Sequence, residues 1–116
     1  MARTDMPGVI AGGDSSCART RKVRALGSFT GTMAEMVAEA DFVVEAVFED
    51  LALKRSVFAD LDSLSPERTI LSSNTSSFMS SQLASATARP DRVVVANWWN
   101  PPHLLPLVEI VRGPET

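Results

Sequence analysis

The fold of this chain is decided by residues 42–73, which read FVVEAVFEDLALKRSVFADLDSLSPERTILSS. Residues 42–48 are almost continuously apolar, with β-branched and aromatic side chains, and this predicts a strand covered on both faces. Asp50 can cap a helix that runs to about Leu64, because its carboxylate can accept a free backbone N–H. The helix ends before Pro66, and the last five residues of the segment form a second strand. Strand, helix and strand in this order predict parallel pairing through a crossover helix.

The same pattern continues on both sides of this segment. Upstream, Thr32 followed by Glu35 forms a capping box at the start of a short helix. Downstream, residues 80–86 have the pattern of a helix, residues 93–97 that of a third strand and residues 104–111 that of a fourth. The sequence therefore predicts an α/β fold with a small, mostly parallel sheet and crossover helices.

Residues 1–23 differ from the rest, because they hold glycines and scattered arginines without any period. We expect a flexible N-terminal arm at 1–23 and one folded domain at 24–116. The net charge of −3 does not favour a nucleic-acid partner, and a lone Cys17 excludes an internal disulfide and a cysteine-based metal site. No metal is expected. Without a membrane-length apolar run or a signal-peptide core, we expect a cytoplasmic protein with no membrane contact.

Polar clusters follow two of the predicted strands. The cluster SSNTSS at residues 72–77 follows the second strand, and the cluster NWWNPPH at residues 97–103 follows the third. The carboxyl ends of parallel strands meet at one edge of a sheet, which is where open α/β sheets bind their ligands. The sequence therefore predicts a binding or catalytic site at this edge.

In their order and spacing these motifs resemble the nucleotide-binding domain of NAD-dependent 3-hydroxyacyl-CoA dehydrogenases, over roughly residues 24–116. The resemblance implies a partial Rossmann-type fold, NAD as cofactor, and a small-molecule substrate, an acyl-CoA or hydroxy acid, in fatty-acid metabolism. It also implies a truncated domain whose first βαβ unit is missing. The nearest match to that unit's Gly-x-Gly-x-x-Gly turn is GVIAGG at residues 8–13, and its glycine spacing is wrong. The family's following helical domain is expected to be absent too.

The resemblance assigns roles to six positions. Cofactor contacts fall on Glu49, Lys54, Ser76 and Asn100, and the catalytic set is Ser76, Asn97 and Glu109. Each position also has a plain structural explanation. The glutamate–lysine pair can be a surface pair, the serine and Asn100 can make turn hydrogen bonds, and Glu109 can lie on a strand edge in water.

Asn97 stands where the family has its catalytic histidine. An amide has no proton to exchange near neutral pH, and general acid–base catalysis contributes about 10²–10⁴ in rate. His103, the only histidine, lies six residues later, and we expect it to be a loop or packing residue. The sequence therefore predicts an NAD-dependent oxidoreductase by descent that is weak or inactive as this chain.

Two alternatives stay open. The chain can be a non-catalytic remnant or interaction module that pairs through the open edge of strand 42–48, either as a homo-oligomer or with a partner that donates a strand. It can also be one half of a split enzyme that a separate polypeptide completes.

Overall fold

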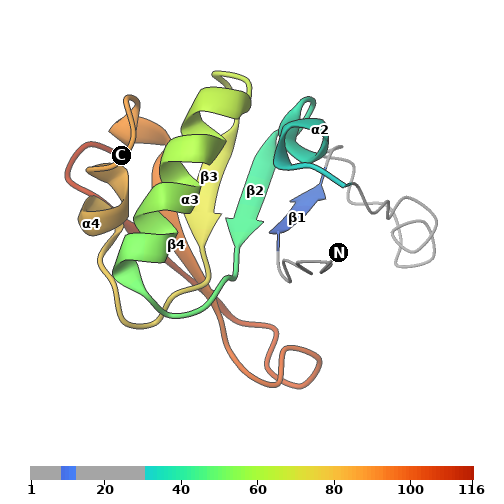
Figure 1. Ribbon diagram of the computed structural model, residues 1–116. Coiled ribbons are helices and arrows are strands. Elements are labelled where there is room, and N and C mark those ends of the chain that lie inside the picture. Colours follow the sequence, from blue (N-terminus) through green and yellow to red (C-terminus); the bar gives the residue numbers. More distant parts are fainter. Residues whose placement is uncertain (1–8, 13–30) are drawn as a thin grey trace.

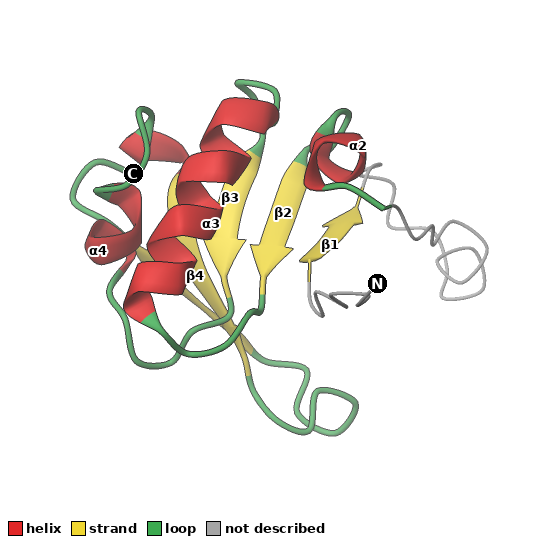
Figure 2. Cartoon of the chain, in the orientation of Figure 1, coloured by secondary structure: helices red, strands yellow, loops and turns green. Residues whose placement is uncertain are grey.

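The computed structural model describes residues 9–12 and 31–116, which form a five-stranded sheet with helices packed against it (Figure 1). The strands lie side by side in chain order, β1-β2-β3-β4-β5. The elements are β1 (Val9–Gly12), α2 (Met33–Val37), β2 (Phe42–Glu45), α3 (Leu51–Leu64), β3 (Ile70–Ser73), α4 (Ser80–Ala84), the 3₁₀ turn η1 (Pro90–Arg92), β4 (Val93–Trp98) and β5 (Val108–Arg112). In Figure 2, α2, α3 and α4 all lie on the near side of the sheet.

The three central strands are parallel and the two edge strands are antiparallel. Val43 of β2 lies opposite Leu71 of β3, and Ser73 of β3 lies opposite Val95 of β4. The predicted α/β fold with crossover helices is confirmed. Strand β2 is shorter than expected, because the Glu45 carboxylate accepts the N–H of Val47 at 2.6 Å and turns the chain out of the ladder.

Strand β1 occupies the edge of β2 that we expected to be open. It runs antiparallel to β2, with Val9 opposite Glu45 and Gly12 opposite Phe42. Pairing through a free β2 edge, or with a partner that donates a strand there, is therefore wrong for this structure, because β1 already satisfies that backbone. The remainder of the expected arm, and the outer glycines of GVIAGG, lie outside the described residues.

Side-chain caps define where α2 and α3 begin. The Thr32 hydroxyl accepts the N–H of Glu35 at 3.3 Å, and the Asp50 carboxylate accepts the N–H of Leu53 at 2.8 Å. Both caps were expected from the sequence, and α3 ends at Leu64 as predicted. No helix in the described part of the chain is long and apolar enough to cross a membrane.

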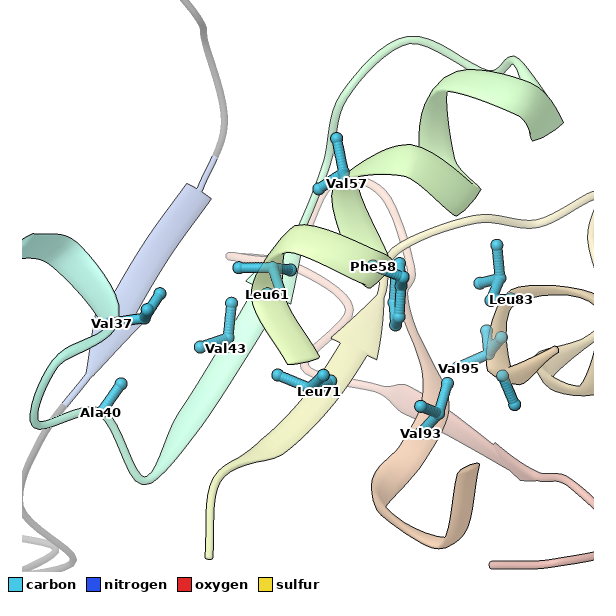
Figure 3. Close-up of a cluster of buried hydrophobic side chains, with 11 residues drawn as sticks. Val37, Ala40, Val43, Val57, Phe58, Leu61, Leu71, Leu83, Val93 and Val95 are labelled. Atoms are coloured by element: carbon cyan, nitrogen blue, oxygen red, sulfur yellow. The ribbon is translucent and has the colours of Figure 1, made fainter. Parts of the chain in front are cut away.

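The hydrophobic core lies between the sheet and the helix layer (Figure 3). Helix α3 contributes Val57, Phe58 and Leu61, which are buried in one cluster with residues of β2, β3 and β4. The cluster as a whole is Val37, Ala40, Val43, Val57, Phe58, Leu61, Leu71, Leu83, Ala84, Val93 and Val95. This core fixes the strands relative to α3, and so fixes the positions of the loops at the strand ends.

A buried ion pair ties the C-terminal end of α3 to the start of β4. Arg92 donates to Asp62 Oδ1 from Nε at 3.0 Å and from Nη2 at 2.6 Å, and to the backbone oxygens of Asp62, Pro66 and Thr69. Burial of Asp62 acts to raise its pKa, but the bonds from Arg92 and from the Ala88 N–H outweigh it and lower that pKa. The pair stabilises the end of the sheet that lies opposite the predicted site, where β4 begins.

Candidate active site

The carboxyl ends of β2, β3 and β4 meet in one rim, as the sequence predicted. Asn74, the residue after β3, connects all three strands. Its N–H donates to the Glu45 carbonyl at 2.9 Å, and its side-chain oxygen accepts the Trp98 N–H at 2.9 Å. The loops that carry the expected site residues are therefore held together by one asparagine whose role the sequence did not indicate.

Asn97 and Glu109 lie directly opposite each other in the antiparallel pair of β4 and β5. Side chains of directly opposed residues project from the same face of the sheet. Asn97 is half-buried and Glu109 is exposed on the edge strand. The structure thus brings together the two positions that the resemblance treats as base and orienting acid, with an amide in place of the base.

Lys54 is buried, and its ammonium group lies within bonding distance of three acceptors of the protein. Its Nζ lies 2.8 Å from Glu45 Oε1, 3.2 Å from the Val47 carbonyl and 3.3 Å from Glu49 Oε2. The Lys54 and Glu45 side chains are 1% and 0% exposed. A lysine ammonium has three donors, and these three acceptors account for all of them. A direct contact between Lys54 and the cofactor stays a prediction.

Glu49 is the exposed end of this buried group. It accepts a hydrogen bond from the Thr75 hydroxyl, and its side chain is 42% exposed. Partial desolvation acts to raise the pKa of Glu49, but the bonds from Thr75 and Lys54 and the charge of Lys54 outweigh it and lower that pKa. Glu49 is therefore a fixed anionic acceptor at the rim, suited to receive a hydrogen bond from a ligand hydroxyl.

The loop that carries Ser76 is shaped by side-chain bonds to its own backbone. Ser73 donates to Glu45 Oε2 at 2.6 Å, and its hydroxyl accepts the Thr75 N–H at 3.2 Å. The Thr75 hydroxyl accepts the N–H groups of Ser77 and Phe78 at 3.1 and 3.2 Å. Ser76 itself is exposed. Its side chain is therefore exposed on a loop whose backbone N–H groups donate to the hydroxyls of Ser73 and Thr75.

Sequence reasoning missed Glu45, Ser73 and Thr75. A signal for Glu45 was present, because an acid in the middle of an apolar strand needs a partner when it is buried. That partner could not be named from the sequence, since the bonds come from β3 and α3.

Asn100 and His103 lie on the loop between β4 and β5. Both are exposed, and the peptide bond between Asn100 and Pro101 is cis. The N–H of Trp99 donates to the Leu107 carbonyl at 3.1 Å and closes the base of the loop. His103 is a loop residue, as expected. Among the residues the structure describes, no group of three or more His, Cys, Asp or Glu is arranged to hold a metal ion.

Three parallel strands, a crossover helix and a polar rim at the strand ends are the features of an open α/β sheet that binds its ligand at the carboxyl ends of the strands. A family model described as "3-hydroxyacyl-CoA dehydrogenase, NAD binding domain" matches residues 2–116. The chain belongs to this family, and NAD is the family's cofactor.

Relatives support the same assignment. The L-carnitine dehydrogenase of Streptomyces griseus subsp. griseus is 44% identical over 87 residues, which are 75% of this chain and 26% of that protein. The fatty acid oxidation complex subunit alpha of Shewanella baltica is 45% identical over 87 residues, which are 75% of this chain and 12% of that protein. The crystal structure of FadB2 from M. tuberculosis is 40% identical with a TM-score of 0.75, covering 85% of this chain and 36% of that one. The chain spans about a quarter or less of these two curated relatives.

Proposed function

We propose that this chain is the substrate-side part of an NAD-dependent oxidoreductase domain for 3-hydroxyacyl-CoA or similar 3-hydroxy acids, in which Asn97 replaces the catalytic base. The observation that carries the proposal is the direct pairing of Asn97 with Glu109 at the rim. In an active member of the family a histidine at this position would take the substrate proton, with the glutamate orienting it.

The rim chemistry fits the ribose and nicotinamide end of NAD. Glu49 offers a fixed anionic acceptor for a ribose hydroxyl, while Ser76 and Asn100 offer exposed polar groups on the adjoining loops. When bound, NAD would supply the hydride acceptor. For the pyrophosphate, the described residues offer no glycine-rich turn that leads into a helix N-terminus, which is the usual cradle. Because the glycine spacing of residues 8–13 also departs from that of the usual cradle, we expect weak binding by this chain.

Proton transfer is the step of the proposed reaction that this chain lacks a group to perform at position 97. Removing a hydride from a carbinol leaves a protonated carbonyl, and the proton needs an acceptor that Asn97 cannot be. The amide can still donate a hydrogen bond to a substrate oxygen, so it can orient a ligand. Loss of the base alone costs about 10²–10⁴ in rate, or roughly 3–5 kcal/mol of activation free energy.

Titration of NAD into the purified chain tests this proposal. Trp98 and Trp99 flank the rim, and their fluorescence should change on binding with a dissociation constant well above the low micromolar range. Reduction of acetoacetyl-CoA by NADH should not exceed the buffer rate. Efficient turnover by the unmodified chain would show that Asn97 does not disable the site. Low-micromolar NAD binding would show that the pyrophosphate is held after all. The split-enzyme alternative stays a prediction.

A further inference from the structure

A buried hydrogen-bond network connects the exposed Glu49 with the loop that carries the exposed Ser76. Lys54 and Thr75 are both buried, and both contact the Glu49 carboxylate, Lys54 at Oε2 over 3.3 Å and Thr75 at Oε1. Behind them, Glu45 is fully buried, and its Oε1 accepts a hydrogen bond from Lys54 Nζ at 2.8 Å. The carboxylate at the rim is thus held from the protein side by groups that solvent does not reach.

The Thr75 hydroxyl is the point that Glu49 and the Ser76 loop share. Its single proton goes to Glu49, and its oxygen accepts the N–H groups of Ser77 and Phe78. The backbone on the C-terminal side of Ser76 is therefore bonded to the same oxygen atom that holds Glu49. A displacement of Glu49 would be transmitted to this loop through one hydroxyl group.

Lys54 contacts the rim through Glu49. Its three donors point to Glu45, to the Val47 carbonyl and to Glu49, so its ammonium group is bonded within the protein. Glu49 is 42% exposed and keeps acceptor capacity toward solvent. Of this group of side chains, Glu49 is the one that a ligand at the rim can reach.

We propose that Lys54 and Thr75 are positioning residues that fix the Glu49 carboxylate relative to the Ser76 hydroxyl, so that both engage hydroxyl groups of one bound ligand. This inference rests on the proposed function, which supplies the ribose as the hydroxyl-bearing group. Local charge favours the same chemistry. One ammonium faces the two carboxylates of Glu45 and Glu49, and Asp50 follows in the sequence, so the group is net negative and suits a neutral hydroxyl better than a phosphate.

The test is a pH titration of the Glu49 side-chain carboxylate by carbon-13 NMR, without any ligand. The parent chain is compared with Lys54→Met, Thr75→Val and the conservative Thr75→Ser. Thr69→Val is the matched control, because Thr69 is also a buried threonine but donates to the Ala40 carbonyl at the opposite end of the sheet, at 2.6 Å.

We expect the pKa of Glu49 to rise in Lys54→Met and Thr75→Val, where its bonds are lost, and to stay at the parent value in Thr75→Ser and Thr69→Val. The amide resonances of Ser76 and Ser77 should shift in Thr75→Val and return in Thr75→Ser. A variant that only loosened the fold would act alike in Thr75→Val and Thr69→Val and would not be rescued by Thr75→Ser. If Lys54→Met fails to fold because Glu45 is left unpaired, Glu45→Gln combined with Lys54→Met removes both charges and still takes the ammonium away from Glu49.

Unchanged Glu49 titration in both Lys54→Met and Thr75→Val would overturn the inference, as would unmoved loop amides in Thr75→Val. Addition of millimolar NAD to the parent chain then tests the proposed function separately. Shifts at Glu49 and Ser76 would support it. Their absence would refute NAD binding at the rim, while the ligand-free titration would still decide whether Lys54 and Thr75 position Glu49.

Discussion

Replacing Arg92 with methionine should destabilise the domain more than any exposed ion-pair mutation. All five N–H groups of the guanidinium are used, two toward Asp62 Oδ1 and three toward backbone oxygens, and both side chains are buried. Removing one partner of a buried pair typically costs about 3–5 kcal/mol, because the other charge is left without compensation. Arg89 lies 3.5 Å from the same carboxylate and can compensate partly, which places the expected loss near the lower end.

Urea unfolding followed by far-ultraviolet circular dichroism measures this loss. Arg68→Met is the matched control, because Arg68 also pairs with an aspartate, Asp41, at 2.7 Å, yet their side chains are 61% and 56% exposed. We expect the control to lose less than about 1 kcal/mol. Domains of this size are typically stable by about 5–15 kcal/mol, so a loss of about 3 kcal/mol is readily measured. Equal losses in the two variants would refute the reasoning; Arg92→Lys, which keeps the charge, covers the case in which Arg92→Met does not fold.

The same pair predicts a pH dependence. The pKa of Asp62 is lowered in the folded state, so its ionised form stabilises the fold at neutral pH. This contribution is present above the unfolded pKa of about 3.9 and is lost as the pH falls further, through the lower folded value. The stability gap between the parent and Arg92→Met should therefore narrow below about pH 4. A gap that stays constant down to pH 2 would contradict the assigned cause.

Three further changes test the site and the sheet. Asn97→His alone should not raise the reduction of acetoacetyl-CoA by NADH above the parent rate, because orienting two reactants accounts for about 7–11 kcal/mol and one base cannot replace it; a clear increase would contradict this. Ile10→Pro combined with Ala11→Pro should uncover the edge of β2 and shift the chain toward dimers or aggregates in size-exclusion chromatography with light scattering, whereas an unchanged elution profile would mean that β1 is not what covers the edge. Glu109→Gln should change the free energy of unfolding in urea by less than about 0.5 kcal/mol, since the residue is exposed on an edge strand; a larger loss would show a structural role.

The elements that the sequence predicted well are those whose signals are local. Helix α3 was placed by the Asp50 cap and by Pro66 after its end, and both act within a few residues of the helix. Strand β1 could not be predicted, because its four residues have no periodic pattern and pair with β2 residues that lie 30 to 36 positions away. The early end of β2 was missed for a similar reason, since the Glu45 carboxylate competes for the backbone of Val47.

The same difference between local signals and long-range contacts applies to the candidate site. The resemblance to the family placed Asn97 and Glu109 in one catalytic set, and the structure sets them opposite each other, although the antiparallel pairing of β4 and β5 was not predicted from the sequence. The group behind Glu49 could not be assembled, since Glu45, Lys54, Ser73 and Thr75 belong to three different segments and only the fold brings them together. Spacing along one element is visible in a sequence, whereas contact among three elements is not.

The structure of the rim does not depend on catalytic activity. The side chains that shape it, among them Lys54, Thr75 and Asn74, bond to one another or to backbone, so they stabilise the fold whether or not a reaction takes place. Asn97 is half-buried near the end of β4 and is not one of these groups. A change of side chain at this position therefore alters the chemistry and leaves these bonds in place. It follows that variants at Lys54 and Thr75 test the positioning of Glu49, whereas a variant at position 97 tests the predicted catalytic role.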